Sequence, residues 1–248
     1  MWSTNAKAKM RKLSLSSNGP IKNETANHSY ACRFFMTAFD IHIHTRCYSG
    51  CSFIQYEDIV GQAVSAHLTG IALTEHGMCW PDAEFDKLRR QADDCGIVLI
   101  NGQEIHARNI QGRSEGEYLV FGLGRSVTEI RTASDLVETV HAEGGIIIAA
   151  HPYKLSRGGK SHYYGAGDLV YKLKLDGIEL CHPDHSDLAM KKVTKVMEEL
   201  KIPGTGGSDA HKIFNIGSHV TLFENRITCE EDFIREIRSS RISAAKRS

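Results

Sequence analysis

From Phe35 onward, short apolar runs of strand length alternate with longer stretches in which apolar residues recur at helical spacing. The apolar runs predict strands at Ala38–His44, Gly70–Thr74, Ile97–Glu104, Tyr118–Gly122, Gly145–Ala150, Gly177–Cys181, Ile202–Gly206 and Ser218–Phe223. The stretches between them predict helices at Tyr56–His67, Ala83–Cys95, Ser134–Glu143, Gly167–Leu175, Asp187–Lys201 and Glu230–Ser239, with Ser134 as an N-cap and Gly144 as a stop. Such alternation implies parallel strands joined by right-handed crossovers, and the number of repeats favours a barrel over a minimal doubly wound sheet.

Two stretches interrupt this rhythm. Arg108–Glu117 is polar and contains Gly, which predicts a hairpin-like loop. Tyr153–Gly167 combines several glycines with Lys154, Arg157 and Lys160. In a barrel, a long loop of this kind would lie on the face that carries the chemistry.

The first 35 residues lack the alternation. They are rich in Ser, Asn, Lys and Arg, and their only acidic residue is Glu24. This composition predicts a disordered tail for residues 1–35, with a transit peptide as the alternative. At about 100–200 residues per domain, the length suits one large domain or two small ones. Residues 36–248 are predicted to form a single domain, because the histidine and acidic motifs extend from Asp40 to His211.

Composition narrows the class of protein. The 248 residues include 30 basic and 30 acidic side chains, so the formal net charge is zero, which argues against a protein that grips nucleic-acid backbone by bulk charge. No apolar run reaches the roughly 18 residues of a spanning helix, so no membrane partner is predicted. The seven cysteines are odd in number and form no C-x-x-C pair, which indicates a reducing compartment and predicts a cytoplasmic location.

Histidine is the unusual residue, with 13 copies, and several of them stand with acidic residues where predicted strands end. The segments are Asp40-Ile-His42-Ile-His44, Thr74-Glu75-His76, Gly102-Gln-Glu104, Ala150-His151-Pro152 and Gly207-Ser-Asp209-Ala-His211. In a parallel barrel the carboxyl ends of all strands share one rim, so we expect these side chains to converge.

The residue types at these positions suit a metal site. His42 and His44 are two apart in a strand and therefore point to the same side, where both can bind one ion. Neutral imidazoles and carboxylates are ligands for zinc, manganese or iron. Each residue also has a plainer interpretation, such as a helix N-cap for Asp209 or a solvated charge for Glu104.

Taken in order, and together with Gly177-Ile-Glu179, these segments resemble the PHP (polymerase and histidinol phosphatase) superfamily. The resemblance extends from about Phe35 to the C-terminus. It implies an α/β fold, a distorted (β/α)7 TIM-like barrel of the PHP type. It also implies two or three divalent metals (Mn, Zn or Fe) on the carboxyl rim and the hydrolysis of phosphoesters by a metal-activated water.

The resemblance also implies the ligands. They are His42, His44, Glu104 and Asp209 for a first metal, Glu104 and His151 for a second, and His76 and His211 for a third. Lys154 and Arg157 follow the histidine–proline pair and are candidates to clamp a phosphate, or are simply a solvated loop. His182 and His185 follow a strand on the same rim and are candidate substrate contacts, ligands or surface residues.

Two departures from the family pattern affect the second and third metals. The acid or histidine that often follows the first histidine pair is absent, although Cys47 or Cys51 stands close enough in sequence to substitute. The histidine often found in the fourth strand is also absent, and Leu119 is predicted to occupy its position.

Three hypotheses about function follow. The first is a metal-dependent phosphoesterase acting on a small phosphorylated substrate, and the second is a PHP nuclease acting on oligonucleotide ends. The third is a non-catalytic metal-binding domain, which the loss at Leu119 motivates. The sequence makes no prediction of the oligomeric state.

Overall fold

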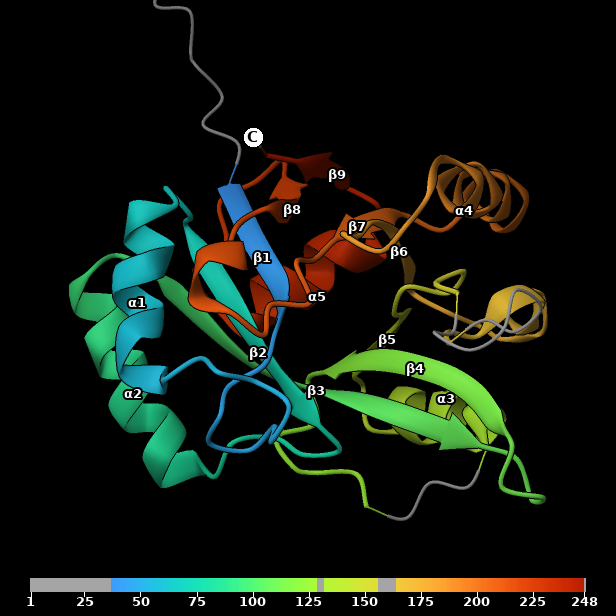
Figure 1. Cartoon of the computed structure of the whole chain (residues 1–248), viewed down its shortest axis with the longest axis horizontal. Helices are drawn as coiled ribbons and strands as arrows, with labels where there is room; N and C mark the ends of the chain where they lie inside the picture. Colours follow the sequence, from blue (N-terminus) through green and yellow to red (C-terminus); the bar gives the residue numbers. More distant parts are fainter. Residues whose placement is uncertain (1–36, 129–131, 156–163, 248) are drawn as a thin grey trace, which may run out of the picture. The chain divides into compact units, whose positions relative to one another are not determined.

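A single mixed sheet of nine strands organises the residues that the computed structural model describes, which are 37–128, 132–155 and 164–247 (Figure 1). The predictions for residues 1–35 lie outside this range. The strands are β1 (Thr37–Ile43), β2 (Gly70–His76), β3 (Val98–Arg108), β4 (Ser114–Phe121), β5 (Ile146–Ala149), β6 (Gly177–Cys181), β7 (Gly204–Gly206), β8 (His219–Phe223) and β9 (Ile242–Lys246). They lie side by side in the order β7-β6-β5-β4-β3-β2-β1-β8-β9.

The helices lie close to their predicted positions. They are α1 (Tyr56–Ser65), α2 (Asp82–Asp94), α3 (Ala133–Ala142), α4 (Asp187–Leu200) and α5 (Glu230–Arg238), and short 3-10 turns occupy Gly167–Lys172 and Ile213–Asn215. The helix predicted at Gly167–Leu175 is therefore a 3-10 turn, and β9 was not predicted. The N-cap of α3 is Thr132, which forms a capping box with Asp135, and so the predicted cap at Ser134 is wrong. Among the described residues, none of the helices combines the length and the apolar character needed to cross a bilayer.

Strand β4 reverses the expected direction. β1, β2 and β3 pair in parallel, as do β5, β6 and β7, but β4 is antiparallel to both of its neighbours and β8 is antiparallel to β1. The prediction of uniformly parallel strands is wrong at these positions. The reason is the short turn at residues 109–113, where the Asn109 and Arg113 backbones are hydrogen-bonded and Gly112 has a φ of +74°. A turn this short can join only antiparallel strands.

The sheet curves until its ends nearly meet, which confirms the prediction of a TIM-like barrel. Gly206 of β7 donates its N–H to Thr221 Oγ1 of β8 at 3.0 Å, and the same hydroxyl donates to the Gly206 carbonyl at 3.0 Å. Its sheet has nine strands, two more than the resemblance implied.

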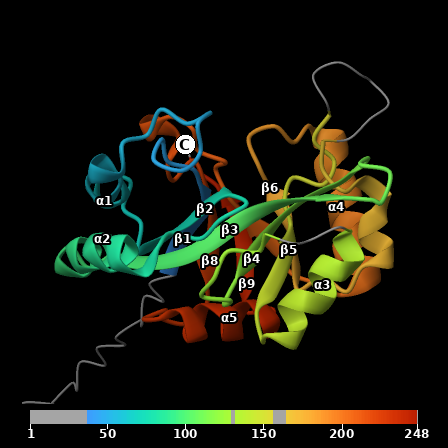
Figure 2. The same cartoon turned by 90° about the horizontal axis from the view of Figure 1, so that it is seen from below.

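The two ends of the barrel differ in chemistry. Phe39, Phe121, Phe223 and Phe233 form an aromatic cluster with ring centroids 5.0–6.1 Å apart, and Phe233 belongs to α5, which lies across one end of the strands (Figure 2). The opposite end is the carboxyl rim of the parallel strands. Because β4 is reversed, it presents its N-terminal half to that rim.

We expect Thr221→Val to lower the free energy of unfolding by about 2 kcal/mol or more. Valine keeps the shape of the buried side chain but leaves the N–H and C=O of Gly206 without this partner, and such groups cost about 1–3 kcal/mol each. Urea unfolding of purified protein measures the loss. Thr194→Val is the matched control, because Thr194 is exposed on α4 and its hydroxyl only donates to a carbonyl of its own helix. Equal stability of the two variants would contradict the role of Thr221 in closing the barrel.

Candidate metal centre

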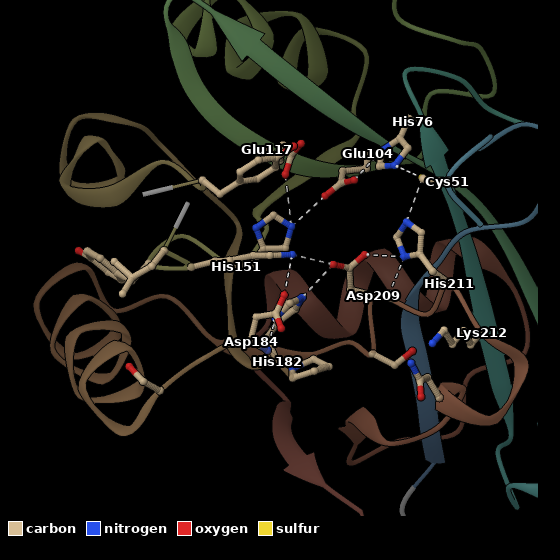
Figure 3. Close-up of a pocket in the computed structure, with 18 of the residues that line it drawn as sticks. Cys51, His76, Glu104, Glu117, His151, His182, Asp184, Asp209, His211 and Lys212 are labelled. Carbon is tan, nitrogen blue, oxygen red and sulfur yellow. Dashed lines mark hydrogen bonds and ion pairs between the residues drawn. The ribbon is translucent and has the colours of Figure 1, made fainter. Parts of the chain in front are cut away.

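A cavity of about 1050 Å³ opens at the carboxyl rim, and residues from six strands or strand ends meet in it (Figure 3). Of the predicted ligands, five line its wall: His76, Glu104, His151, Asp209 and His211. His42 and His44, the other two, lie fully buried directly behind them. The structure therefore brings together all seven residues that the sequence singled out as ligands.

The tightest group contains the four residues predicted for the first metal. The Nε2 atoms of His42 and His44 lie 3.5 and 3.2 Å from Asp209 Oδ1. They lie 3.3 and 3.5 Å from the two carboxylate oxygens of Glu104. Two donors bound to one zinc at about 2.1 Å in tetrahedral geometry stand roughly 3.4 Å apart, so these spacings fit the edges of a coordination tetrahedron.

Unsatisfied nitrogen atoms also make this group a candidate metal site. His42 Nε2, His44 Nε2 and His151 Nδ1 are buried and have no hydrogen-bond partner among the described residues. Buried polar atoms normally have a partner, and the binding of an ion is a standard reason for an exception. The donor set therefore fits a divalent metal held by imidazole and carboxylate.

Three further buried carboxylates hold this arrangement in place. Glu179 accepts hydrogen bonds from His42 Nδ1 at 3.0 Å and from the His151 backbone at 2.7 Å, so the His42 ring keeps its Nε2 lone pair for the cavity side. Asp40 accepts from the backbones of Ser208 and Gly217 at 3.0 and 2.7 Å, which fixes the loop that carries Asp209. Glu75 accepts hydrogen bonds from the Thr45 backbone and the Ser49 hydroxyl, which fixes the loop after β1. None of the three was predicted as a ligand, and each acts on the residues around the site.

Backbone conformation brings two of the ligands inward. His151 and Asp209 have φ values of +27° and +48°, in the left-handed region that is uncommon for residues other than Gly. Gly207 allows the approach, because a Cβ there would come within 2.5 Å of Glu179 Oε1 and of the His42 Cβ. Backbone strain of this kind concentrates at functional sites.

A second group of donors includes a residue that the sequence analysis missed. His151 Nε2 lies 3.1 Å from Glu104 Oε1 and 3.4 Å from Glu117 Oε2. Glu117 was assigned to a loop, but it belongs to β4 and is paired with His106 of β3. Leu119, two residues further along, is paired with Glu104 and is fully buried in the apolar core. A carboxylate therefore stands where the sequence indicated a lost ligand, and alternation along β4 was the signal that could have found it.

A third group lies at the edge of the cavity. His44, His76 and His211 come together there, with His76 and His211 partly exposed. Cys51 joins them, because its sulfur lies 3.3 Å from His76 Nε2 and 3.1 Å from His211 Nε2 (Figure 3). Cys47, the other candidate, is exposed and is not in the cavity wall.

Of the predicted substrate residues, Lys154 and His182 line the cavity and His185 does not. Lys154 lines the cavity with its ammonium 3.1 Å from Asp209 Oδ2 and 2.9 Å from Asp184 Oδ2. His182 also lines the cavity, 3.4 Å from Asp209 Oδ2. His185 lies behind His182, outside the cavity wall, and its Nδ1 donates to the Leu180 carbonyl. Arg157 lies outside the described residues.

Comparison with known proteins shows a partial match to a family model and a likeness in fold. The family model described as PHP-associated matches residues 188–242. A two-domain protein from Bacteroides vulgatus that contains a predicted PHP-like metal-dependent phosphoesterase has the same fold, with a TM-score of 0.66 and 20% identity over 85% of this chain and 65% of that one. The chain therefore has the fold of a PHP-like protein, and its residues 188–242 match the PHP-associated model.

Other proteins are similar to this chain over varying lengths. An uncharacterized protein of Methanocaldococcus jannaschii is 27% identical over 173 residues, 65% of this chain and 92% of its own length. A phosphoribosyl 1,2-cyclic phosphate 1,2-diphosphodiesterase of Eggerthella lenta is 35% identical over 88 residues, but these cover 36% of this chain and only 31% of that enzyme. A lesion-specific endonuclease from Pyrococcus furiosus shares the fold with a TM-score of 0.53 and 17% identity, over 84% of this chain and 57% of that one.

Burial and neighbouring charges shift the pKa values of several groups in the site. Burial would raise the pKa of Glu104 and of Asp209, but the nearby imidazoles, with His42 foremost, hold both values well below the ordinary range. Burial lowers the pKa of His44 to about 4, so this ring is neutral at pH 7, as a ligand must be. Burial and then the charge of Glu104 raise the pKa of Glu117 to about 7. The site thus keeps the Glu104 and Asp209 carboxylates ionised and the His44 ring neutral at pH 7.

We expect Glu179→Gln to weaken metal binding about 10–100-fold, because the carboxylate orients His42 and His151 without facing the cavity itself. Titration calorimetry with manganese or zinc measures the affinity. Glu199→Gln, which alters an exposed ion pair on α4, is the control and should bind as the parent does. An unchanged affinity in a folded Glu179→Gln protein would remove Glu179 from this role.

Proposed function

We propose that this protein is a metal-dependent phosphoesterase that acts on a small phosphorylated substrate. The observation that carries the proposal is the convergence of seven imidazole and carboxylate side chains, with unsatisfied ring nitrogens, in one cavity of substrate size. The PHP fold and the diphosphodiesterase relative support it.

Three groups of residues would hold two or three ions of manganese, zinc or iron. His42, His44, Glu104 and Asp209 would hold the first, Glu104, Glu117 and His151 the second, and His76 and His211 the third. Divalent metals at such sites supply positive charge for the phosphate oxygens and make water acidic enough to attack phosphorus near neutral pH. The ligands must be deprotonated, so metal binding releases protons. One of these protons comes from His42: burial would lower the pKa of this ring, but Glu179, Asp209 and Glu104 raise it well above its ordinary value.

His182 is suited to donate a hydrogen bond to the substrate. The Asp184 backbone N–H donates to its Nδ1 at 3.1 Å, so the proton of the neutral ring resides on Nε2. That Nε2 is buried and makes no hydrogen bond among the described residues, although Asp209 Oδ2 lies 3.4 Å away. Burial lowers the pKa of His182 to about 4, which keeps the ring neutral at pH 7. We assign His182 Nε2–H to a phosphate oxygen rather than to a metal.

Lys154 contributes mainly by neutralising charge. Burial would lower its pKa, but the carboxylates of Asp209 and Asp184 outweigh burial and raise it. The ammonium therefore stays charged at the cavity wall, where a substrate phosphate can share it with the two carboxylates.

A nuclease acting on oligonucleotide ends is the second candidate. The likeness in fold to the lesion-specific endonuclease favours it. So does Phe53 at the cavity wall, with 67% of its surface exposed, because an exposed ring beside a phosphate site can stack on a base. The zero net charge favours the small substrate.

The proposal also includes the extent of the catalytic domain and its location in the cell. Residues 36–248 act as one catalytic domain, which the single sheet through the described residues supports. The enzyme acts in the cytoplasm, which the six free cysteines among the described residues support.

The function is tested with manganese-loaded protein and three substrates: a generic phosphomonoester, a phosphodiester and a short labelled oligonucleotide. We expect turnover of one of the small esters and its complete loss in the double variant His42→Ala, Asp209→Ala. The paired control is His67→Asn, Asp94→Ala, which changes exposed residues away from the cavity. Absence of turnover with metal bound would overturn the enzyme proposal, and a strong preference for the oligonucleotide would favour the nuclease.

We expect His182→Phe to lower turnover about 100-fold while the bound metal is unchanged, because one preorganised donor to a developing charge is worth about 10²–10³ in rate. Steady-state kinetics and elemental analysis of the same preparation give the two values. Loss of a metal equivalent in the variant would instead make His182 a ligand.

A further inference from the structure

We propose that Arg108 and Ser114 form a second anion-binding subsite beside the cavity, so that the substrate is a phosphoester that carries a further anionic group. Both residues lie on the ribbon that β3 and β4 form together, and neither is in the cavity wall. Neither residue is a candidate metal ligand. The inference deepens the proposed function, on which it rests, because it names a class of substrate.

The outer part of this ribbon projects beyond the sheet (Figure 1). β2 pairs with β3 only as far as Glu104, so residues 105–108 pair with β4 alone. Because side chains alternate along a strand, His106 and Arg108 lie on the same face as Glu104, which lines the cavity. The ribbon thus extends this wall of the cavity outward.

Two side chains connect the ribbon with the cavity. The Tyr164 ring lines the cavity, and its centroid lies 6.5 Å from the rings of both His106 and His151. Glu117 is also in the cavity wall, and its Oε1 lies 4.0 Å from His106 Nδ1. A ligand that extends from the cavity past Tyr164 therefore meets the face that carries Arg108.

Hydrogen bonds hold the Arg108 guanidinium back toward the cavity. Its Nη2 donates to His106 Nδ1 at 3.3 Å, and its Nη1 donates to the Gly112 carbonyl at 3.2 Å. Both acceptors are neutral, and Arg108 forms no ion pair with any residue that the structure describes. A guanidinium has five N–H donors, so several of them remain for a ligand, and its positive charge is not neutralised.

The same hydrogen bonds leave a donor on Ser114. A guanidinium can only donate, so His106 Nδ1 is unprotonated and Nε2 carries the proton. Nε2 donates to Ser114 Oγ at 2.8 Å, and the Gly116 backbone donates to the same oxygen at 3.2 Å. These two bonds use the acceptor positions of the hydroxyl, so its own hydrogen is available to a ligand. A guanidinium and a hydroxyl donor together suit an anionic oxygen.

The spacing indicates how far apart the two anionic groups of the substrate are. The Arg108 guanidinium contacts the ring of His106, which is two residues from Glu104, and two residues of a strand span roughly 7 Å. Glu104 is a candidate ligand of the first and second metals, beside which the ester phosphate would bind. The second anionic group is therefore separated from the phosphate by a spacer about as long as a sugar ring.

Phosphonates test the subsite without turnover, because their P–C bonds are not hydrolysed. Butylphosphonate and butane-1,4-bisphosphonate are titrated calorimetrically into full-length, manganese-loaded protein. We expect the bisphosphonate to bind about 10–100-fold more tightly, because a charge-assisted hydrogen bond is worth about that factor. Arg108→Gln should remove this advantage and leave the affinity for butylphosphonate unchanged. Arg113→Gln is the matched control, since Arg113 carries the same charge in the turn between β3 and β4, and it should keep the advantage.

Two further ligands identify the anion. 5-Phosphonopentanoate carries a carboxylate at its far end, and so it distinguishes a general anion site from a phosphate site. A short single-stranded DNA that loses affinity in Arg108→Gln would assign the second group to a nucleic-acid backbone, and one that does not would assign it to a small molecule.

Equal affinity of the two butyl ligands in the parent protein, or an advantage that persists in Arg108→Gln, would overturn the inference. Absence of turnover in a protein that shows the Arg108-dependent advantage would instead overturn the proposed function, so the two failures are distinguishable.

Discussion

The structure depends on the placement of carboxylates in a buried space at one end of the barrel. Four carboxylates are largely excluded from water: Glu104, Glu117, Glu179 and Asp209. Burial would raise the pKa of Glu104 and of Asp209, but the His42 ring beside them holds both values well below the ordinary range. Burying so many acids is costly unless positive charge accompanies them. The imidazoles supply part of that charge, and the geometry around their unsatisfied nitrogens provides for divalent cations to supply the rest.

The apolar end of the barrel makes this arrangement possible. The cluster of Phe39, Phe121, Phe223 and Phe233 closes one end, and α5 covers it, so that hydrophobic burial stabilises the sheet away from the site. Strand ends at the opposite rim can then carry polar and strained residues such as His151 and Asp209. Stability and function are in this way assigned to opposite ends of the same strands.

Outer hydrogen bonds decide what each histidine can do. His42 donates from Nδ1 to Glu179, His76 to Glu104 and His211 to the Asp209 carbonyl. Each of these rings therefore keeps the Nε2 lone pair that a metal would need. The Asp184 backbone does the reverse at His182, where Nε2 keeps its proton. Residues of one type therefore divide into candidate ligands and a candidate hydrogen-bond donor according to a second partner of each ring.

The sequence by itself determined eight of the nine strands, nearly all of the helices and the candidate ligands carried in H-x-H, Asp-x-His and strand-end positions. These features are local, since a spacing of two residues in a strand fixes a shared side and a strand end fixes a rim. Only the tertiary structure decided that β4 runs backward and turns Glu117 toward His151, and that Cys51 meets His76 and His211. Those outcomes depend on a short turn, on strand register and on loop contacts between residues far apart in the chain, which no local spacing encodes.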